Sequence, residues 1–557
     1  MTGNLTPKER ILKDCLLLLL LAGVIYLPFL SLAPWSENEP IRVIIAKDML
    51  KTGNWLIPKL HGKPYFVKPP LMNWLIALSG AFFGSVNEWT SRLPSVISTF
   101  LTGISIYFLT AGRLGRDGRF FASVATLAMG GLIEKGRTAG IDSLFIFSVT
   151  IALLVWINGY LKNWRPVLLW CAALFLLSIS FLAKGPQSIA YFYTTVFAYL
   201  AIRKRPSFFF SKAHLPGIGL LVLILGIYLL SILRFVSLDE YLNMWINQIL
   251  QRSVSKHPFS FIEHFFLYPL SVAGAFMPWV LFIVPAVFFK GLKGRPEIFK
   301  NEIFVFSLVM VAVNFPVYWL LPRAKVRYFL PAAPFVAIIA AVFFEFYLAR
   351  IKEIPGIDLF FKRLVKAISW VALVFALMTP FISSYTGLKL SFPSILPPAV
   401  LIFSCVTILS MASSAELKNI PVYLAVIVGL SLLVYSNLSV AMDSQKTYYP
   451  RNIAREINLV LPGDVTTVYE MGYRTFLEVT CYIEKDVVEI DSFSALKEAA
   501  DREDGVFFIF DARFLNSAKD KDILLKEIKW EKVYSKYFDE KKGEIVLGYI
   551  KGNKPLP

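Results

Sequence analysis

The sequence has few charged residues and few cysteines for its length, and it lacks the common nucleotide-binding and hydrolase motifs. Only 17% of its 557 residues are charged, whereas soluble domains average about 25%. Its four cysteines form no close pair and show no metal-type spacing, which gives no support to a disulfide framework or a zinc site. The motifs G-x-G-x-x-G, P-loop, G-x-S-x-G and H-E-x-x-H are all absent, so the classes that depend on them have no support.

Apolar residues dominate instead. They make up 56% of the chain, with 48 phenylalanines and 12 tryptophans, and the mean hydropathy is +0.60. These values predict an α-helical polytopic membrane protein with aromatic residues at the membrane interfaces. The net charge of +18 does not indicate nucleic acid, because the basic residues lie in short runs between apolar segments, as in cytoplasmic loops that contact anionic lipid.

The pattern predicts about thirteen transmembrane helices, since a span needs roughly 20 apolar residues. The first, at about 14–32, is interpreted as a retained span because no small-residue cleavage site follows it. The segments begin near residues 14, 92, 120, 143, 166, 187, 215, 264, 302, 329, 365, 395 and 421.

The distribution of lysine and arginine predicts the orientation. With thirteen spans, the basic runs fall on one side of the membrane, so the N-terminus is expected in the cytoplasm. The long loop 33–90 is then extracytoplasmic and part of a transmembrane domain at 1–442. Residues 443–557 are expected outside the membrane on the same side as that loop.

The composition changes at about residue 443, where charges become frequent. Short apolar runs predict strands, and amphipathic runs predict helices at 451–459 and 496–501. The alternation predicts a small α/β domain at 443–557. The expected strands cover residues 465–469, 487–490, 506–510 and 545–550.

The first outer loop is unusually polar for a connection between spans. Glu37 and Glu39 precede a helix-like run at 41–50, and Tyr65 and Lys68 precede the double proline Pro69-Pro70. Carboxylates followed by a fixed tyrosine and lysine suggest an active-site loop. Alternatively, the loop is merely interfacial and its two glutamates cap the helix.

Other ionisable groups lie at span ends on the same predicted side, where charged groups are functional candidates. Together these cations outnumber the carboxylates, which suits a phosphate or pyrophosphate ligand. Asp142 can equally cap a helix, Lys184 can snorkel to the interface, and Tyr65 and Tyr328 can belong to an aromatic belt. The set comprises Asp142, Lys184, Arg252, Arg327 and Tyr328 in addition to the loop residues.

Several motifs, in order along the chain, resemble a known family. The sequence contains Gly53-Asn54-Trp55, Tyr65-Phe66-Val67-Lys68-Pro69-Pro70-Leu71, Asn87-Glu88-Trp89, Phe181-Leu182-Ala183-Lys184-Gly185 and Arg327-Tyr328-Phe329-Leu330-Pro331. It is similar here to the lipid A aminoarabinose transferases and their relatives, the GT-C membrane glycosyltransferases that include the protein O-mannosyltransferases. The tyrosine–lysine–proline stretch is the most specific of these matches.

The resemblance implies a polyprenyl-phosphate sugar donor and a site on the outer face of the membrane. By position, Tyr65, Lys68, Lys184, Arg252 and Tyr328 would surround the donor phosphate. Glu37, Glu39 and Asp142 would act on the acceptor or on a divalent metal ion, which the resemblance allows although no motif requires a cofactor. Arg42 and Arg327 would bind substrate. The resemblance implies each of these roles from the position of the residue in the family's motifs.

One departure concerns the acidic start of the loop. The family usually has Asp-Glu followed by Arg-Tyr, whereas this chain has Asn38-Glu39 followed by Ile41-Arg42. An amide therefore replaces the first acid unless Glu37 substitutes for it, and the arginine is displaced to Arg42.

These patterns predict an inverting glycosyltransferase of a bacterial inner membrane. It would move aminoarabinose or a related sugar from undecaprenyl phosphate to lipid A or another envelope acceptor. A protein O-glycosyltransferase of the same superfamily is an alternative. A second alternative is a lipid-linked sugar transporter, but the polar residues of a transporter should lie at mid-span in two related halves. A scaffold that binds through residues 443–557 is a third.

Overall fold

The structure, a computed structural model, is mostly helical and divides into two compact units. Unit 1 comprises Met1–Leu30, Phe66–Met72 and Arg92–Leu438, and unit 2 comprises Ser31–Tyr65, Asn73–Ser91 and Ser439–Pro557. The outer loop thus shares a compact unit with the C-terminal region, while the predicted boundary between 442 and 443 stays a prediction. The structure describes residues 6–243, 246, 258–288, 297–354, 356–386, 392–444, 449–471, 476–503, 505–513, 530–539 and 543–552.

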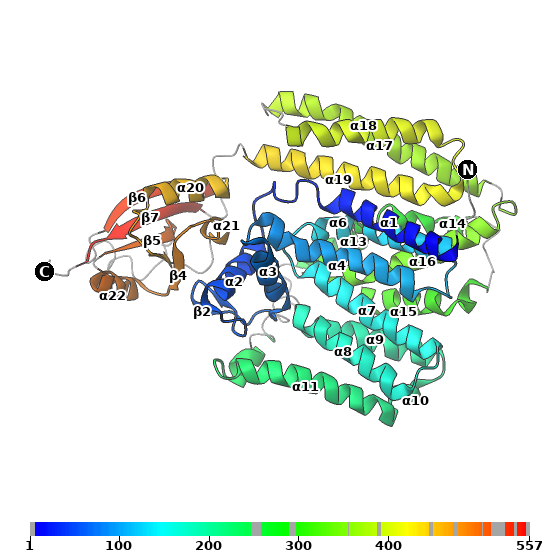
Figure 1. Cartoon of the computed structure of the whole chain (residues 1–557), viewed down its shortest axis with the longest axis horizontal. Helices are drawn as coiled ribbons and strands as arrows, with labels where there is room; N and C mark the ends of the chain where they lie inside the picture. Colours follow the sequence, from blue (N-terminus) through cyan, green and yellow to red (C-terminus); the bar gives the residue numbers. More distant parts are fainter. Residues whose placement is uncertain are drawn as a thin grey trace. The chain divides into compact units, whose positions relative to one another are not determined.

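Unit 1 consists of helices, and its long helices run alongside one another (Figure 1). α7 packs against α8, α8 against α11, and α16 against both α5 and α15. The helices are α1 (Pro7–Tyr26), α4 (Glu88–Leu109), α5 (Arg116–Leu127), α6 (Gly130–Gly136), α7 (Asp142–Leu161), α8 (Pro166–Lys184), α9 (Gln187–Ile202), α10 (Pro206–Phe209), α11 (Leu215–Ile232), α13 (Pro258–Ala275), α14 (Pro285–Phe288), α15 (Glu302–Trp319), α16 (Ala333–Ala349), α17 (Ile357–Thr386), α18 (Phe392–Met411) and α19 (Ile420–Ser444). Short 3-10 turns lie at Lys212–His214, Trp279–Phe282, Ile298–Lys300, Val326–Tyr328, Leu330–Ala332 and Leu417–Asn419.

Eight helical segments within the described residues are long and apolar enough to cross a membrane. The prediction of a polytopic helical membrane protein is therefore confirmed, whereas the number thirteen is not established. The eight are Glu88–Leu109, Asp142–Leu161, Pro166–Lys184, Pro206–Ile232, Glu302–Trp319, Leu330–Ala349, Ile357–Ile382 and Leu417–Met442.

The other five predicted segments are also helical, but each is short or interrupted by polar residues. α5 stops at Leu127, and α6 restarts at Gly130 after a break. α9 has 16 residues, and α1 carries several charged residues in its first two turns. The apolar pattern therefore predicted where the helices lie, but it did not predict the break between α5 and α6.

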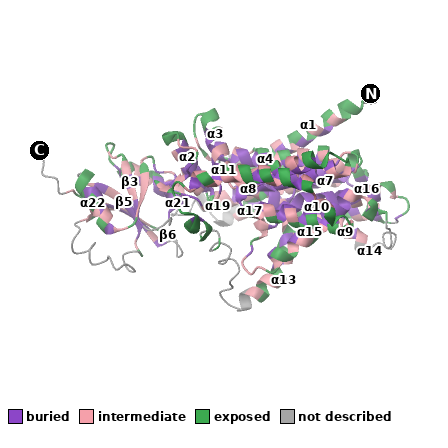
Figure 2. Ribbon diagram, turned by 90° about the horizontal axis from the view of Figure 1, so that it is seen from below, coloured by how far each residue is buried: buried purple, intermediate pink, exposed green. Residues whose placement is uncertain are grey.

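Burial separates the central helices of unit 1 from its peripheral ones (Figure 2). In the span that contains α16, 78% of the apolar window is buried inside the protein, compared with 22% in the span that contains α11. A helix that is apolar all round yet exposed is suited to contact with lipid. The composition of α11 is therefore explained by a membrane rather than by a protein core.

The loop portion of unit 2 contains two helices and a small hairpin. These are α2 (Glu39–Thr52), β1 (Lys59–Leu60), β2 (Lys63–Pro64) and α3 (Leu71–Phe83), which also contributes to unit 1. His61 and Gly62 have φ values of 47° and 80° at the hairpin turn. Two consecutive left-handed residues fit the tight turns that match the twist of paired strands.

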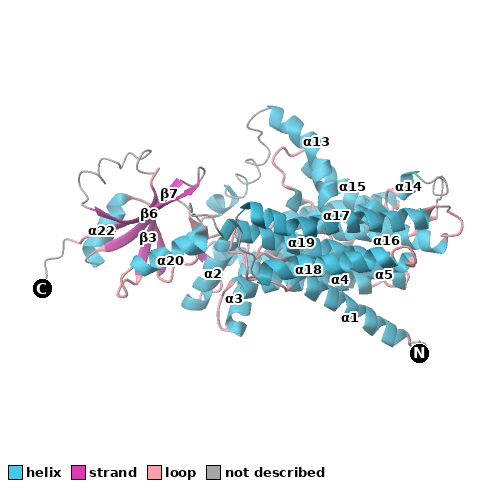
Figure 3. Ribbon diagram, turned by 90° about the horizontal axis from the view of Figure 1, so that it is seen from above, coloured by secondary structure: helices cyan, strands magenta, loops and turns pink. Residues whose placement is uncertain are grey.

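The C-terminal portion of unit 2 forms a five-stranded mixed sheet of order β4-β3-β5-β7-β6 (Figure 3). β3 pairs in parallel with β4 and β5, whereas β7 pairs antiparallel with β5 and β6. Four of the strands coincide with predicted ones, and β6 was missed. The elements are α20 (Pro450–Val460), β3 (Thr467–Met471), α21 (Leu477–Thr480), β4 (Asp486–Ile490), α22 (Phe493–Glu503), β5 (Val506–Asp511), β6 (Trp530–Asp539) and β7 (Gly543–Ile550).

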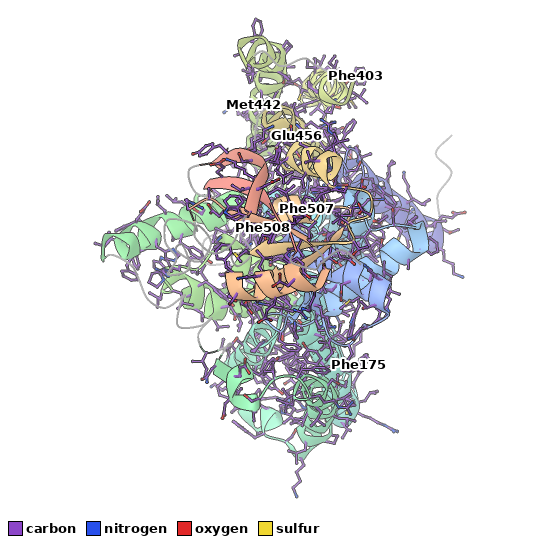
Figure 4. All side chains as sticks on the ribbon, turned by 90° about the vertical axis from the view of Figure 1, so that its left-hand side faces the viewer. Phe175, Phe403, Met442, Glu456, Phe507 and Phe508 are labelled. Carbon is purple, nitrogen blue, oxygen red and sulfur yellow. The ribbon has the colours of Figure 1, made fainter. Side chains whose placement is uncertain are left out.

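Each face of this sheet packs on its own helices. On β5, Ile509 joins a core with Ile453 and Ile457 of α20, while Phe508 joins a core with Leu496 of α22. Phe507 borders the α20 core, so Phe507 and Phe508 point to opposite faces (Figure 4). This alternation follows from the two-residue period of a strand.

Candidate functional site

The acidic stretch at the start of the loop contains one buried and one exposed glutamate. Glu39 is the first residue of α2 and is 4% exposed, and its Oε2 accepts a hydrogen bond of 3.1 Å from the Ser36 amide. Glu37 is exposed, with a left-handed φ of 53°. The Asn38 side chain makes no capping hydrogen bond. Of the two candidate acids, Glu39 is therefore the buried one.

Arg42 lies one turn along α2 and meets Tyr65 inside unit 2. Its guanidinium carbon is 5.5 Å from the centre of the Tyr65 ring, and its Nη1 donates to Asn73 Oδ1 at 3.4 Å. Arg42 and Tyr65 are 3% and 4% exposed. The Tyr65 amide donates to the Pro58 carbonyl, which fixes the tyrosine behind the hairpin. Arg42, a predicted substrate-binding residue, and Tyr65, a predicted phosphate-binding residue, are thus brought together.

Charged groups elsewhere on α2 are partly withdrawn from water. Burial lowers the pKa of Lys47, whose ammonium donates to the Cys481 carbonyl at 2.8 Å. Burial also raises the pKa of Asp48, although nearby Lys59 and Lys51 oppose this shift. The Lys47 hydrogen bond connects α2 to the C-terminal portion of unit 2.

In unit 1, Asp142 and Lys184 form a buried ion pair. Asp142 is the first residue of α7, and Lys184 is the last residue of α8. Lys184 Nζ lies 2.6 Å from Asp142 Oδ1, and the two residues are 6% and 8% exposed. Gly185, at a φ of 93°, ends α8 directly after the lysine. The two residues, which were predicted separately, are therefore close enough for Lys184 to orient Asp142.

Aromatic rings and a second cation surround this ion pair. Lys184 Nζ is 4.7 Å from the Phe145 ring centre and 5.5 Å from that of Tyr328. The Arg327 guanidinium carbon is 5.7 Å from the same Tyr328 ring, and Arg327 interacts electrostatically with Asp142. The Tyr191 hydroxyl donates to the Tyr328 carbonyl at 2.7 Å. Asp142, Lys184, Arg327 and Tyr328 are thus one cluster.

Of the other two predicted phosphate-binding residues, Lys68 is described by the structure and Arg252 is not. Lys68 is half-buried and precedes Pro69-Pro70 and α3. The prolines stiffen the backbone that carries the lysine. Arg252 lies outside the described residues, so its role stays a prediction.

Sequence reasoning missed Lys135, a further cation near Asp142. It lies on α6, its side chain is 13% exposed, and it pairs with Glu134 at 2.5 Å. It also interacts electrostatically with Asp142. Its clue in the sequence was the polar run Glu134-Lys135-Gly136-Arg137 between apolar segments.

Within the ranges that the structure describes, no three histidine, cysteine, aspartate or glutamate side chains are grouped closely enough to hold a metal ion. The donor set around Asp142 is made of cations and tyrosines, which are poor ligands for a divalent metal. We therefore assign no chemical step to a metal.

Sequence comparisons find similar proteins of known type. The family model for dolichyl-phosphate-mannose-protein mannosyltransferases matches residues 67–230. An undecaprenyl phosphate-alpha-4-amino-4-deoxy-L-arabinose arabinosyl transferase of Pseudomonas aeruginosa is 36% identical over 178 residues, which cover 31% of this chain and 32% of that enzyme. The chain is a glycosyltransferase that resembles the lipid A aminoarabinose transferases. A longer match, with an uncharacterized protein of Aquifex aeolicus, is 27% identical and covers 82% of this chain and 84% of the relative.

Solved structures extend the likeness of this glycosyltransferase to the whole fold. ArnT from Cupriavidus metallidurans in the apo state superposes with a TM-score of 0.70 at 14% identity, covering 97% of each chain. The same protein bound to undecaprenyl phosphate gives a TM-score of 0.68 at 16% identity, covering 98% of each chain. The glycosyltransferase therefore shares the fold of that protein.

Proposed function

We propose that this glycosyltransferase moves aminoarabinose or a related sugar from undecaprenyl phosphate to lipid A or another envelope acceptor. The support comes from relatives named for transfer of 4-amino-4-deoxy-L-arabinose from undecaprenyl phosphate, and from a fold shared with a protein crystallised with undecaprenyl phosphate. The site would face the outer side of a bacterial inner membrane.

The observation that carries the proposal is the positive cluster around Asp142. Three cations, Lys184, Arg327 and Lys135, act on two carboxylates, Asp142 and Glu134. An excess of positive charge at the end of membrane helices suits a phosphate bearing negative charge. A transporter would instead place such groups at mid-span.

Each chemical role follows from the reaction. The acceptor oxygen bonds to the anomeric carbon as the bond from that carbon to the phosphate oxygen breaks, and the electron pair leaves on the phosphate. We propose that Lys68, Lys184 and Arg252 bind that phosphate, with Tyr65 and Tyr328 beside it, because cations stabilise its growing charge. Arg42 and Arg327 would hold the substrates.

The acidic residues would act on the acceptor. A hydroxyl acceptor must lose a proton, and we assign this proton to the carboxylate of Glu39, with Asp142 orienting the substrates. A phosphate acceptor is already a nucleophile and needs mainly charge neutralisation. Attack opposite the leaving phosphate inverts the anomeric carbon.

The membrane arrangement is part of the same proposal. We infer thirteen crossings, with the N-terminus in the cytoplasm and residues 443–557 on the opposite, periplasmic side. The eight clear spans and the shorter helices support this count. A reporter fused after residue 552 tests the orientation, because an active periplasmic reporter requires export.

A protein acceptor is the second candidate. It is favoured by the match of residues 67–230 to the protein mannosyltransferase family. Incubating membranes with labelled donor and separating lipid from protein products distinguishes the two acceptors.

The central test is transfer in membranes that contain the wild-type protein or the Lys68→Ala variant. Transfer from undecaprenyl-phosphate aminoarabinose to lipid A is followed by mass spectrometry. We expect wild-type transfer, and in Lys68→Ala a loss of about 100-fold, because one phosphate-binding cation is absent.

Lys51→Ala is the matched control, because Lys51 is an exposed loop lysine that pairs with Asp486. Transfer by that variant should stay within about twofold of wild type, since exposed ion pairs contribute little. No product with the wild-type protein would contradict the proposed function, whereas full activity of Lys68→Ala would contradict only the role of Lys68.

A further inference from the structure

A cluster within unit 2 joins the C-terminal region to the chain immediately before the acidic stretch. Arg451 of α20 donates from Nη1 to the Leu32 carbonyl at 3.0 Å, and from Nη2 to the carbonyls of Ser31 at 2.9 Å and Ala33 at 3.2 Å. Its Nε and Nη2 also donate to Glu88 Oε1 at 2.9 and 2.5 Å. One guanidinium thus holds three successive carbonyls and a carboxylate.

Tyr482 adds a second connection to the same segment. Its hydroxyl accepts from the Trp35 amide at 2.8 Å and donates to Glu88 Oε1 at 2.7 Å. Its ring stacks on the Trp35 ring, with centres 4.7 Å apart. The Trp35 indole also donates to Ser91 Oγ at 3.0 Å. Trp35, at 3% exposure, is therefore fixed at its backbone and at its side chain.

The fixed segment leads directly to the candidate base. Ser36 follows Trp35, its amide donates to Glu39 Oε2 at 3.1 Å, and its carbonyl accepts from the Glu39 amide at 3.0 Å. Fixing Trp35 therefore fixes the group that orients the Glu39 carboxylate. The exposed residues Glu37 and Asn38 lie between and make the turn.

We propose that Arg451, Tyr482 and Glu88 are positioning residues that hold the acidic stretch so that Glu39 points at its substrate. The proposal rests on the proposed function, in which Glu39 acts on the acceptor. Only arginine presents five donors in a rigid plane, which explains how one side chain serves four acceptor groups. Misplacing a catalytic group by about 1 Å can cost about 100-fold in rate.

The test uses full-length purified protein and two readouts. The first is kcat and KM for the lipid-linked donor in wild type, Arg451→Ala, Arg451→Lys and Tyr482→Phe. We expect kcat to fall about 100-fold in Arg451→Ala, with KM within about threefold, because the donor contacts are elsewhere. Arg451→Lys should recover little, since an ammonium cannot span the same acceptors.

The second readout is hydrogen–deuterium exchange of peptides that cover residues 33–40. The amides of Trp35, Ser36 and Glu39 all donate hydrogen bonds, and we expect them to exchange at least 10-fold faster in Arg451→Ala. Tyr482→Phe removes only a hydroxyl, so it keeps the fold testable if the arginine variant is unstable. It should accelerate exchange at Trp35.

Arg455→Ala is the control, because Arg455 is an exposed arginine on the same helix. It should match wild type in both readouts. Unchanged exchange at 33–40 in both Arg451→Ala and Tyr482→Phe would overturn the proposal. So would a fall in kcat accompanied by an equal rise in KM, if both changes followed a lower thermal midpoint. If wild type transfers no sugar, the proposed function fails, while exchange still decides whether the cluster orders the stretch.

Discussion

Asp142 and Lys184 depend on each other because both are buried. We expect Asp142→Asn or Lys184→Met alone to lower the free energy of unfolding by about 3–5 kcal/mol, since each leaves a buried charge without its partner. The double variant should recover most of that stability, as two neutral side chains need no pairing. Thermal unfolding of detergent-purified protein measures this.

Measuring sugar transfer distinguishes the contribution of this ion pair to stability from its contribution to the reaction. We expect the stable double variant to transfer no sugar, because the proposed phosphate-binding cation and the carboxylate are both absent. Additive losses of stability in the double variant would contradict a direct buried interaction between the 2.6 Å partners.

Because Glu39 is buried and Glu37 is exposed, neutralising each of them should affect sugar transfer differently. Glu39→Gln should lower transfer by about 100-fold or more, as expected when a positioned base is neutralised. Glu37→Gln should change transfer by less than about threefold, because the Glu37 side chain is exposed to solvent, whereas a catalytic base needs a precisely positioned carboxylate. Initial rates of transfer, normalised to the amount of protein in the membrane, provide the measurement.

The two substitutions are isosteric and control for each other. Both keep the helix α2 start, so a stability effect common to both would show as a shared change in protein level. A larger loss in Glu37→Gln than in Glu39→Gln would reverse the assignment of the base.

At the scale of helices, α11 approaches α8 closely at Gly217. A Cβ atom at this position would lie 2.9 Å from the backbone carbonyl of Trp170, which cannot move without shifting α8. Small residues allow such close backbone contact in membranes. We expect Gly217→Ala to destabilise the protein by about 1–3 kcal/mol through overpacking, measured as a lower thermal midpoint.

Gly219 provides the matched control two residues further along α11. A Cβ atom there meets nothing within 4 Å, so Gly219→Ala should leave stability unchanged or raise it by up to about 1 kcal/mol through helix propensity. Equal midpoints for the two variants would mean that α11 does not pack on α8 as described.

At the scale of the whole molecule, unit 2 is assembled from chain segments far apart in sequence. The Glu489 amide donates to the His61 carbonyl at 2.9 Å, and Trp35 and Val43 share a core with Cys481. Deleting residues 443–557 would remove Glu489 and Cys481, and with them all of these contacts. We expect the truncated protein to lose sugar transfer, since its outer loop would lack the surface on which it folds.

The measurement compares transfer at matched protein levels in the membrane, quantified by immunoblot. Full transfer by the truncated protein would contradict a role for residues 443–557 in ordering the loop. It would also contradict an interpretation of that region as a binding scaffold required for the enzyme to function.

Prediction from the sequence succeeded where one physical pattern dominates. The long apolar run of α7 and the short apolar run of β5 were both recognised, because each element buries its apolar side chains. The break between α5 and α6 was missed, since Ala128 and Met129 are apolar and leave the hydrophobic pattern intact. Lys135 was overlooked for a related reason, as its importance depends on Asp142, a partner in another helix.

By itself, the sequence determined that this is a helical membrane protein and which family it resembles, through motifs such as Tyr65-Phe66-Val67-Lys68-Pro69-Pro70-Leu71. Apolar length and local motifs are enough for these conclusions. Only the tertiary structure decided that Glu39 rather than Glu37 is buried, that Lys184 pairs with Asp142, and that Arg451 fixes the chain before the acidic stretch. Those facts depend on contacts between residues distant in sequence, which local patterns do not encode.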